Sequence, residues 1–146
     1  ASGQFQRFSD SNRRTSWLLG WEEGWIQRPR WQFATRLDLG FGHNSADDAV
    51  YFNPSHDSSL NLANSLRILQ WRDADRQMNH LVQIDVGGYR QSGYDSKPAG
   101  ALSYGHEWNL GQSRTFSYGA LVSTHPYDGR SERNFSLFFK LSMALP

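Results

Sequence analysis

The sequence predicts an all-β protein: an antiparallel, up-and-down transmembrane β-barrel with about eight strands, forming one domain over residues 1–146. Two patterns carry the prediction. Apolar and polar residues alternate along most of the chain without helical periodicity, and short connections alternate with longer ones. A third observation is that aromatic residues make up 14% of the chain although its mean hydropathy is only −0.69. The rings are therefore spread over every other position and are not gathered in the apolar runs of an ordinary core.

Each predicted strand is a segment with a period of two, which gives it one apolar and one polar face. In chain order these segments cover residues 4–9, 15–22, 31–43, 60–68, 82–89, 101–108, 116–123 and 134–143. The first is only about half of the 9 to 11 residues that a tilted strand needs to cross a membrane. We therefore expect the chain to begin in mid-strand, as a piece of a larger barrel.

The connections predict which way the strands run through a bacterial outer membrane. Those at 27–30, 72–77 and 111–114 are short, and those at 43–57, 91–97 and 125–133 are longer. Outer-membrane barrels have short periplasmic turns and longer outer loops, which places both chain ends on the periplasmic side. Four tryptophans lie beside the short turns and predict an interfacial aromatic girdle: Trp25, Trp31, Trp71 and Trp108.

Composition excludes several classes of protein. A net charge of +1 lacks the basic excess of a nucleic-acid binder, and the absence of cysteine excludes disulfide frameworks and thiol chemistry. No stretch is long and apolar enough to be a membrane-spanning helix, and no motif calls for a cofactor. The alternative fold is a soluble β-sandwich, but its exterior would carry more lysine than Lys97 and Lys140.

If the apolar face meets lipid, a set of charged and aromatic residues points inward. Its members are Glu22, Arg36, Asp38, Arg67, Asp85, Tyr89, Glu107 and Lys140. Such charges must form ion pairs or face water. An eight-stranded barrel is filled by its own side chains, whereas roughly 16 strands leave an aqueous channel. The sequence therefore leaves open a plugged scaffold and one half of a pore.

Two other chemistries receive little support. The residues His43, Asp47, Asp48, His56 and Asp57 have side chains that bind metals, but their spacing is not that of a tight site, and solvated loop polarity is the simpler interpretation. Ser123 and His125 share the inward face, but two residues on one strand do not make a triad. We expect no metal site and no enzyme. His125-Pro126-Tyr127-Asp128-Gly129 is interpreted as a turn that could also constrict a pore mouth.

Three stretches together resemble a known family. They are Arg7-Phe8-Ser9-Asp10-Ser11-Asn12-Arg13-Arg14, Tyr51-Phe52-Asn53-Pro54, and His125-Pro126-Tyr127-Asp128-Gly129 followed by Glu132-Arg133. Their order and spacing resemble the C-terminal part of the outer-membrane porins that export poly-β-1,6-N-acetyl-D-glucosamine, a biofilm exopolysaccharide. The resemblance implies a barrel of roughly 16 strands, a preceding periplasmic helical-repeat domain, outer-membrane lipid around the barrel, and an exopolysaccharide substrate whose modifying enzyme is a potential periplasmic partner.

The same resemblance implies roles for the inward residues. A partly deacetylated polymer is cationic, so carboxylates on the lumen wall would attract it through spaced, weak sites. We expect Glu22, Asp38, Asp85 and Glu107 to form this wall, with Tyr89 as a sugar-stacking ring. Structural pairing with Arg36, Arg67 and Lys140 is an equal alternative. The predicted function is polysaccharide export, and the alternative is a plugged eight-stranded barrel that acts as a structural or adhesive scaffold.

Overall fold

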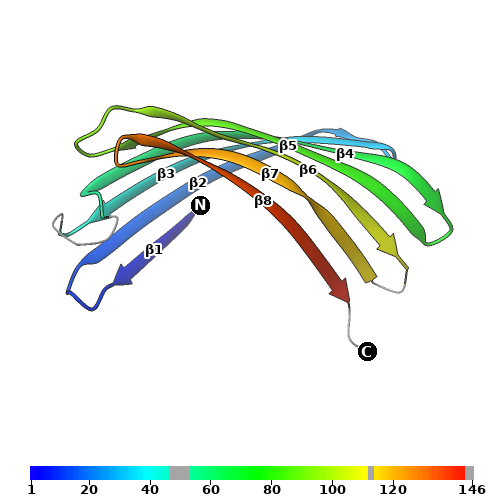
Figure 1. Cartoon of the computed structure of the whole chain (residues 1–146), viewed down its shortest axis with the longest axis horizontal. Helices are drawn as coiled ribbons and strands as arrows, with labels where there is room; N and C mark the ends of the chain where they lie inside the picture. Colours follow the sequence, from blue (N-terminus) through cyan, green and yellow to red (C-terminus); the bar gives the residue numbers. More distant parts are fainter. Residues whose placement is uncertain (47–52, 112–113, 144–146) are drawn as a thin grey trace.

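A computed structural model describes residues 1–46, 53–111 and 114–143, which form eight antiparallel strands (Figure 1). The strands are β1 (Ser2–Arg7), β2 (Arg13–Gln27), β3 (Trp31–Asn44), β4 (His56–Asp73), β5 (Arg76–Gln91), β6 (Lys97–Leu110), β7 (Arg114–Tyr127) and β8 (Arg130–Met143). Each predicted strand is present, and most extend beyond the alternating segment that predicted them. Within these described ranges, no helix is long and apolar enough to cross a membrane.

All eight strands belong to a single arched sheet in which each pairs with its neighbours in the chain, in the order β1 to β8 (Figure 1). The outermost strands, β1 and β8, are not paired with each other, so the sheet is open. The sandwich alternative is wrong, because it requires two packed sheets. The all-β, up-and-down prediction is confirmed.

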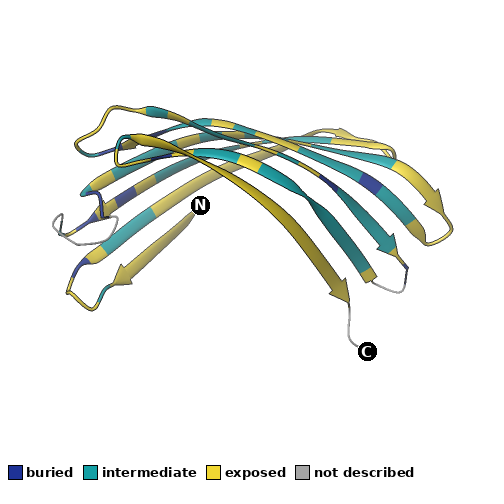
Figure 2. Ribbon diagram, in the orientation of Figure 1, coloured by how far each residue is buried: buried dark blue, intermediate teal, exposed yellow. Residues whose placement is uncertain are grey.

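The sheet is a single layer, and no second element packs on it in the described part of the chain (Figure 2). By register, one of its faces is apolar. Large hydrophobic side chains on this face stay exposed, for example Trp17 at 59% and Phe139 at 73%. Among the described residues, the one buried hydrophobic side chain is Tyr89, which lies on the other face. A folded chain exposes so much contiguous apolar surface only where another apolar phase covers it, as a bilayer does for a barrel.

Two β-bulges keep the apolar face continuous beside the short turns. In β2 the register shifts between Gly24 and Ile26, so Trp25 is the extra residue and Ile26 lies opposite Phe33. In β4 it shifts between Leu69 and Trp71, which sets Trp71 opposite Met78. An extra residue reverses the alternation that follows it. Without the second bulge, Trp71 would point to the polar face.

The connections differ from the prediction at one place. Residues 125–133 were expected to form a longer loop, but β7 continues to Tyr127 and β8 begins at Arg130. The turn itself is only Asp128-Gly129, with φ angles of 44° and 71°. Two left-handed residues make the tight hairpin turn that fits the twist of paired strands, and Asp-Gly is a preferred sequence for it. The turn prediction is confirmed, and the loop length is wrong.

The polar face is the concave one, as its side-chain contacts demonstrate. Arg14 on β2 reaches Asp57 on β4 across the intervening strand, with 2.8 Å between Nη2 and Oδ1. Tyr89 on β5 and His125 on β7 also meet across one strand, with 4.9 Å between ring centroids. Side chains two strands apart approach one another only where the sheet curves toward them. Apolar side chains therefore lie on the convex face.

Candidate functional site on the concave face

All eight inward residues of the sequence analysis lie on the concave face. In an antiparallel sheet, directly opposed residues point to the same side. Glu22 is opposite Arg36, Glu107 is opposite Asn79, and Lys140 is opposite Ser117. The remaining members follow by alternation along β3, β4 and β5.

Two of the four carboxylates form ion pairs. Arg36 Nε lies 2.9 Å from an Asp38 carboxylate oxygen along β3. Arg67 of β4 pairs with Glu107 of β6, across β5. The acidic side chains are 18% and 22% exposed, so both pairs are in contact with solvent but not freely hydrated. Asp38 and Glu107 are therefore each paired with an arginine of the concave face in the absence of any ligand.

The other two carboxylates have no cation beside them. Glu22 is exposed, and although Arg36 lies opposite it in register, the arginine pairs with Asp38 instead. Asp85 accepts hydrogen bonds from Gln83 Nε2 at 3.0 Å, a neutral donor. In the part of the chain that the structure describes, neither acid has a basic nitrogen within 4.0 Å, and the same is true of Lys140 and carboxylates. The predicted pairing of Lys140 is therefore not found there.

Glu22 and Asp85 lie on one continuous cross-strand row. The row runs through opposed residues, Glu22 to Arg36, Arg36 to Ala63 and Ala63 to Asp85. Three strand spacings of about 4.8 Å separate the two acids along the curve. The row thus holds two carboxylates that are free to attract a cation, with one arginine between them whose charge is already matched.

Tyr89 does not present an open stacking surface. It is 8% exposed, and its ring packs against His125, whose ring centroid is also 6.3 Å from that of Tyr127. His125 and Tyr127 are themselves exposed. The aromatic group on this wall is therefore a cluster of three rings near the long-loop end, two of which the sequence analysis had assigned to a turn. Their alternation with Pro126 was the signal that they continue a strand.

A hollow of about 490 Å³ occupies the concave face at mid-sheet. Polar side chains from β2 to β6 line it, among them Glu22, Arg67 and Gln83, and Phe138 of β8 closes one side. Phe138 lies over Gly119 and Gly105: Cβ atoms added to these glycines would be 2.5 Å and 3.0 Å from its Cζ. An apolar ring on the polar wall is explained by this packing on glycine, which gives the ring a surface to cover.

The motif segments of the first hairpin and the longest loop contact each other at the long-loop end. Asn12, 1% exposed, donates from Nδ2 to Asn53 Oδ1 at 2.7 Å and accepts from the Ala46 backbone N–H at 3.1 Å. Pro54 accepts a hydrogen bond from Asn44 Nδ2. Tyr51, Phe52, Asp47 and Asp48 lie outside the described residues. These contacts hold the first hairpin against the loop that follows β3.

The other chemistries considered from sequence have no assembled site. Among the residues described, no three histidine or acidic side chains are grouped to hold a metal ion. Asp57 faces inward to Arg14, whereas His43 and His56 are on the opposite face. Ser123 and His125 share the concave face, but no hydrogen bond between them is found in the described chain. The Asp128 turn rests on the neighbouring hairpin, where Gln91 Nε2 donates to Asp128 Oδ1 at 2.7 Å.

Comparison with known proteins places these features in a family. Residues 1–144 match the family described as PgaA membrane beta barrel domain. Two curated relatives, from Escherichia coli K12 and O157:H7, are each named poly-beta-1,6-N-acetyl-D-glucosamine export protein and are 27% identical over 145 residues. These alignments cover 97% of this chain but 18% of the relatives, so the chain spans about a fifth of their length.

A solved structure, described as a bacterial polysaccharide outer membrane secretin, has the same fold. It superposes with a TM-score of 0.90 at 24% identity, over 97% of this chain and 49% of the solved chain. An open eight-stranded sheet that matches half of a larger chain agrees with the unpaired edges of β1 and β8.

Proposed function

Because the chain belongs to the family of PgaA membrane β-barrel domains, we propose that it forms part of an outer-membrane pore through which a poly-N-acetylglucosamine exopolysaccharide leaves the cell. The names of the curated relatives support this substrate class, since both are export proteins for that polymer. The convex apolar face supports contact with outer-membrane lipid. The concave polar face is then the lumen wall.

The observation that carries the proposal is the row with two unmatched carboxylates, Glu22 and Asp85. A partly deacetylated polymer has free amines, part of which are protonated near neutral pH, so that the polymer carries positive charge. Carboxylates already engaged by arginine attract such a polymer less than unmatched ones do. We therefore assign first contact to Glu22 and Asp85, and a weaker contribution to Asp38 and Glu107.

The proposed lumen also suits movement of a polymer. Its carboxylates are separated, partly hydrated, and interrupted by Arg36 and Arg67. Several weak sites allow a chain to bind and then leave, whereas one tight site would hold it. In this arrangement His125 and Tyr127 would offer ring faces to sugars near the long-loop end, with Tyr89 behind them as support.

We propose that the short turns face the periplasm and the longer loops face outward. This orientation rests on the general rule for outer-membrane barrels. Connections 28–30 and 74–75 lie at one end, and 45–55 and 92–96 at the other. A periplasmic enzyme that modifies the polymer would then meet the short-turn end, and that partner is also a prediction. The alternative, a self-closed eight-stranded scaffold, would need β1 to pair with β8, and these strands are unpaired with each other.

Charge removal on the concave row tests the proposal. In the full-length protein, Glu22→Gln with Asp85→Asn should weaken binding of a deacetylated glucosamine oligosaccharide by roughly two- to tenfold, as expected for two partly hydrated charge contacts. Binding of the fully acetylated, neutral oligosaccharide should change little. Titration calorimetry of the protein in detergent measures both affinities.

The chain offers a matched control on the opposite face. Glu23 and Asp73 lie on the convex side, opposite Thr35 and Arg76. Glu23→Gln with Asp73→Asn removes the same net charge without touching the concave row, and should leave binding of the cationic oligosaccharide unchanged. If both double variants lost the same affinity, the effect would be one of net charge and not of the concave row. If the Glu22→Gln, Asp85→Asn variant lost no affinity, these carboxylates would not bind the polymer.

A further inference from the structure

The convex face carries its charges unevenly between its two ends. At the long-loop end, the described convex residues include six basic or imidazole side chains and no carboxylate: Arg7, Arg13, His43, His56, Arg90 and Arg133. The short-turn end of the same face does carry carboxylates, Glu23 and Asp73, beside Arg76, Arg114 and the imidazoles of His80 and His106. A membrane-spanning sheet needs polar residues at both ends and apolar residues between them, but this requirement does not explain why the described carboxylates occur at only one end of the convex face.

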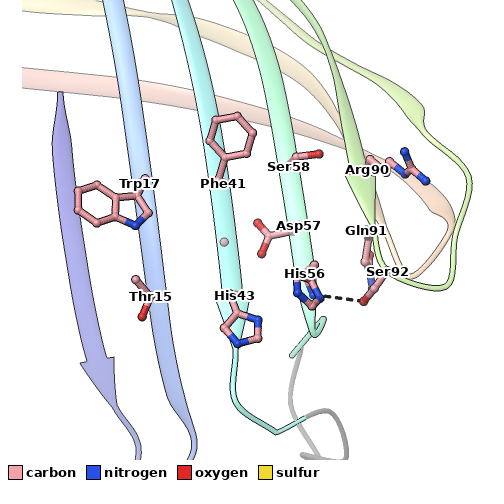
Figure 3. Close-up of a pocket in the computed structure, with 11 residues that line it drawn as sticks. Thr15, Trp17, Phe41, His43, His56, Asp57, Ser58, Arg90, Gln91 and Ser92 are labelled. Atoms are coloured by element: carbon pink, nitrogen blue, oxygen red, sulfur yellow. Dashed lines mark hydrogen bonds between the residues drawn. The ribbon is translucent and has the colours of Figure 1, made fainter.

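Part of this basic end forms a groove of about 740 Å³ (Figure 3). Its apolar part is made by the rings of Trp17 and Phe41, which are 59% and 50% exposed. Its basic part, nearer the loops and lower in Figure 3, holds His43 and His56, with Thr15 and Ser92 beside them. Arg90 lines the groove from β5, in the same cross-strand row as Phe41 and Ser58. Asp57 and Gln91 contribute only from the far side of the sheet, since Asp57 binds Arg14 and Gln91 binds Asp128 on the concave face.

A hydrogen bond fixes one imidazole of the basic part of the groove. His43 Nδ1 is 2.9 Å from the Ser55 carbonyl oxygen, to which it must donate. An anion in the groove would therefore meet this ring through Nε2, the atom that donates in the imidazolium form. The rings of His43 and His56 are 4.7 Å apart, so both can contact one anion. In the described chain, Arg90 has neither a carboxylate partner nor a side-chain hydrogen bond.

We propose that this groove binds a phosphate-bearing lipid of the membrane leaflet that surrounds the long loops. The phosphate would contact His43, His56 and Arg90, and an acyl chain would lie along Phe41 and Trp17. Three features support a lipid over a soluble anion: the groove opens on the face that meets the bilayer, its apolar part continues toward mid-membrane, and the surrounding rim is basic. An arginine with two imidazoles provides the charge-assisted donors that phosphate oxygens accept.

The test uses the full-length protein, freed of lipid in a neutral detergent, and two probes. One is a bis-phosphorylated diglucosamine lipid, and the other is the same lipid after removal of its phosphates. Native mass spectrometry measures how much of each is retained. The triple variant His43→Gln, His56→Gln, Arg90→Gln should lose about tenfold or more in affinity for the phosphorylated lipid, because charged hydrogen bonds are lost. It should bind the dephosphorylated lipid as the unmodified protein does.

A control variant lies on the same face at the other end. His80 and His106 are opposite each other on β5 and β6 and bond to the Tyr104 hydroxyl at 2.7 Å and 3.0 Å. His80→Gln with His106→Gln should leave binding of the phosphorylated lipid unchanged. Heat-modifiable gel mobility reports whether each barrel is folded, and Arg90→Gln alone, an exposed single change, serves if the triple variant does not fold. Unchanged affinity in the groove variants, an equal loss in the control, or equally tight binding of the dephosphorylated lipid would each overturn the proposal.

Discussion

The two faces of the sheet are stabilised in different ways. On the convex face, ring and hydroxyl contacts between described residues join neighbouring strands or residues of one strand, as in Thr35 with Asn64 and His106 with Tyr118. On the concave face, contacts such as Arg14 to Asp57 and Arg67 to Glu107 cross a whole strand. Contacts on the convex face therefore depend on which residues are adjacent along or across neighbouring strands. Contacts on the concave face also depend on how strongly the sheet curves.

This difference decides what each face tolerates. A convex position requires only an apolar side chain of suitable length, because lipid adapts to its shape. A concave position is limited by what reaches over it from two strands away. Substitutions of charge should therefore be most damaging on the convex face, and substitutions of size on the concave face.

The largest expected effect is a charge at the centre of the convex face. Leu62 lies between Leu37 and Val86 in register. Leu62→Arg should destabilise the barrel by about 2–4 kcal/mol, since a lipid-facing arginine at mid-membrane must be desolvated or must deform the bilayer. The measurement is urea-dependent folding of the full-length protein into lipid vesicles.

The neighbouring concave residue is the control for that substitution. Asn61, opposite Asp38 and Gly87, faces the concave side of the same strand. Asn61→Arg should cost clearly less than Leu62→Arg, because the added charge stays on the polar face, beside Asp38, and only its size must be accommodated. If the two arginines were equally costly, the assignment of lipid and water to the two faces would be wrong.

A second, smaller effect sharpens the comparison through size. A Cβ on Gly119 would meet the Tyr104 carbonyl oxygen and would lie 2.5 Å from Phe138 Cζ. A Cβ on Gly88, on the convex face, would meet nothing closer than 3.8 Å. Gly119→Ala should therefore cost about 1–3 kcal/mol, as overpacking does.

Gly88→Ala should be neutral within about 0.5 kcal/mol. The same vesicle-folding assay compares the two alanines. A neutral Gly119→Ala would contradict the packing of Phe138 on the concave face.

The sequence predicted the convex face of the sheet better than the contacts on the concave face. The period of two assigned the convex face of every strand, because facing depends only on a residue's own position. It failed where a bulge intervened: strict alternation along β4 would put Trp71 on the concave face, whereas the register shift sets it on the convex face. The rings of His125 and Tyr127 were assigned to a loop because Pro126 and Asp-Gly indicated a turn, and only the turn was right.

The concave ion pairs between strands could not be predicted, since Arg14–Asp57 and Arg67–Glu107 join residues 43 and 40 positions apart. Alternation placed Asp38, Asp85 and Glu107 on one face but did not decide which had an arginine. That depends on how far each strand is shifted past the next, and on how tightly the sheet curves. Asp57 is the clearest case: it was considered as a loop metal ligand, and it is a strand residue bound to Arg14.

The smallest expected effect concerns the ion pairs that cross a strand, and it tests whether they stabilise the folded sheet. A double-mutant cycle with Arg67→Ala and Glu107→Ala should give a coupling of about 0.2–1 kcal/mol, the range of solvated ion pairs, and salt should reduce it. Asp73 and Arg76 provide the comparison, because they are opposite each other on the convex face but form no ion pair within 4.0 Å among the described residues. Their coupling should be indistinguishable from zero in the same folding assay. A larger coupling for Asp73 and Arg76 than for Arg67 and Glu107 would mean that direct register, and not curvature, determines which charges interact, and the division between the two faces would lose its physical basis.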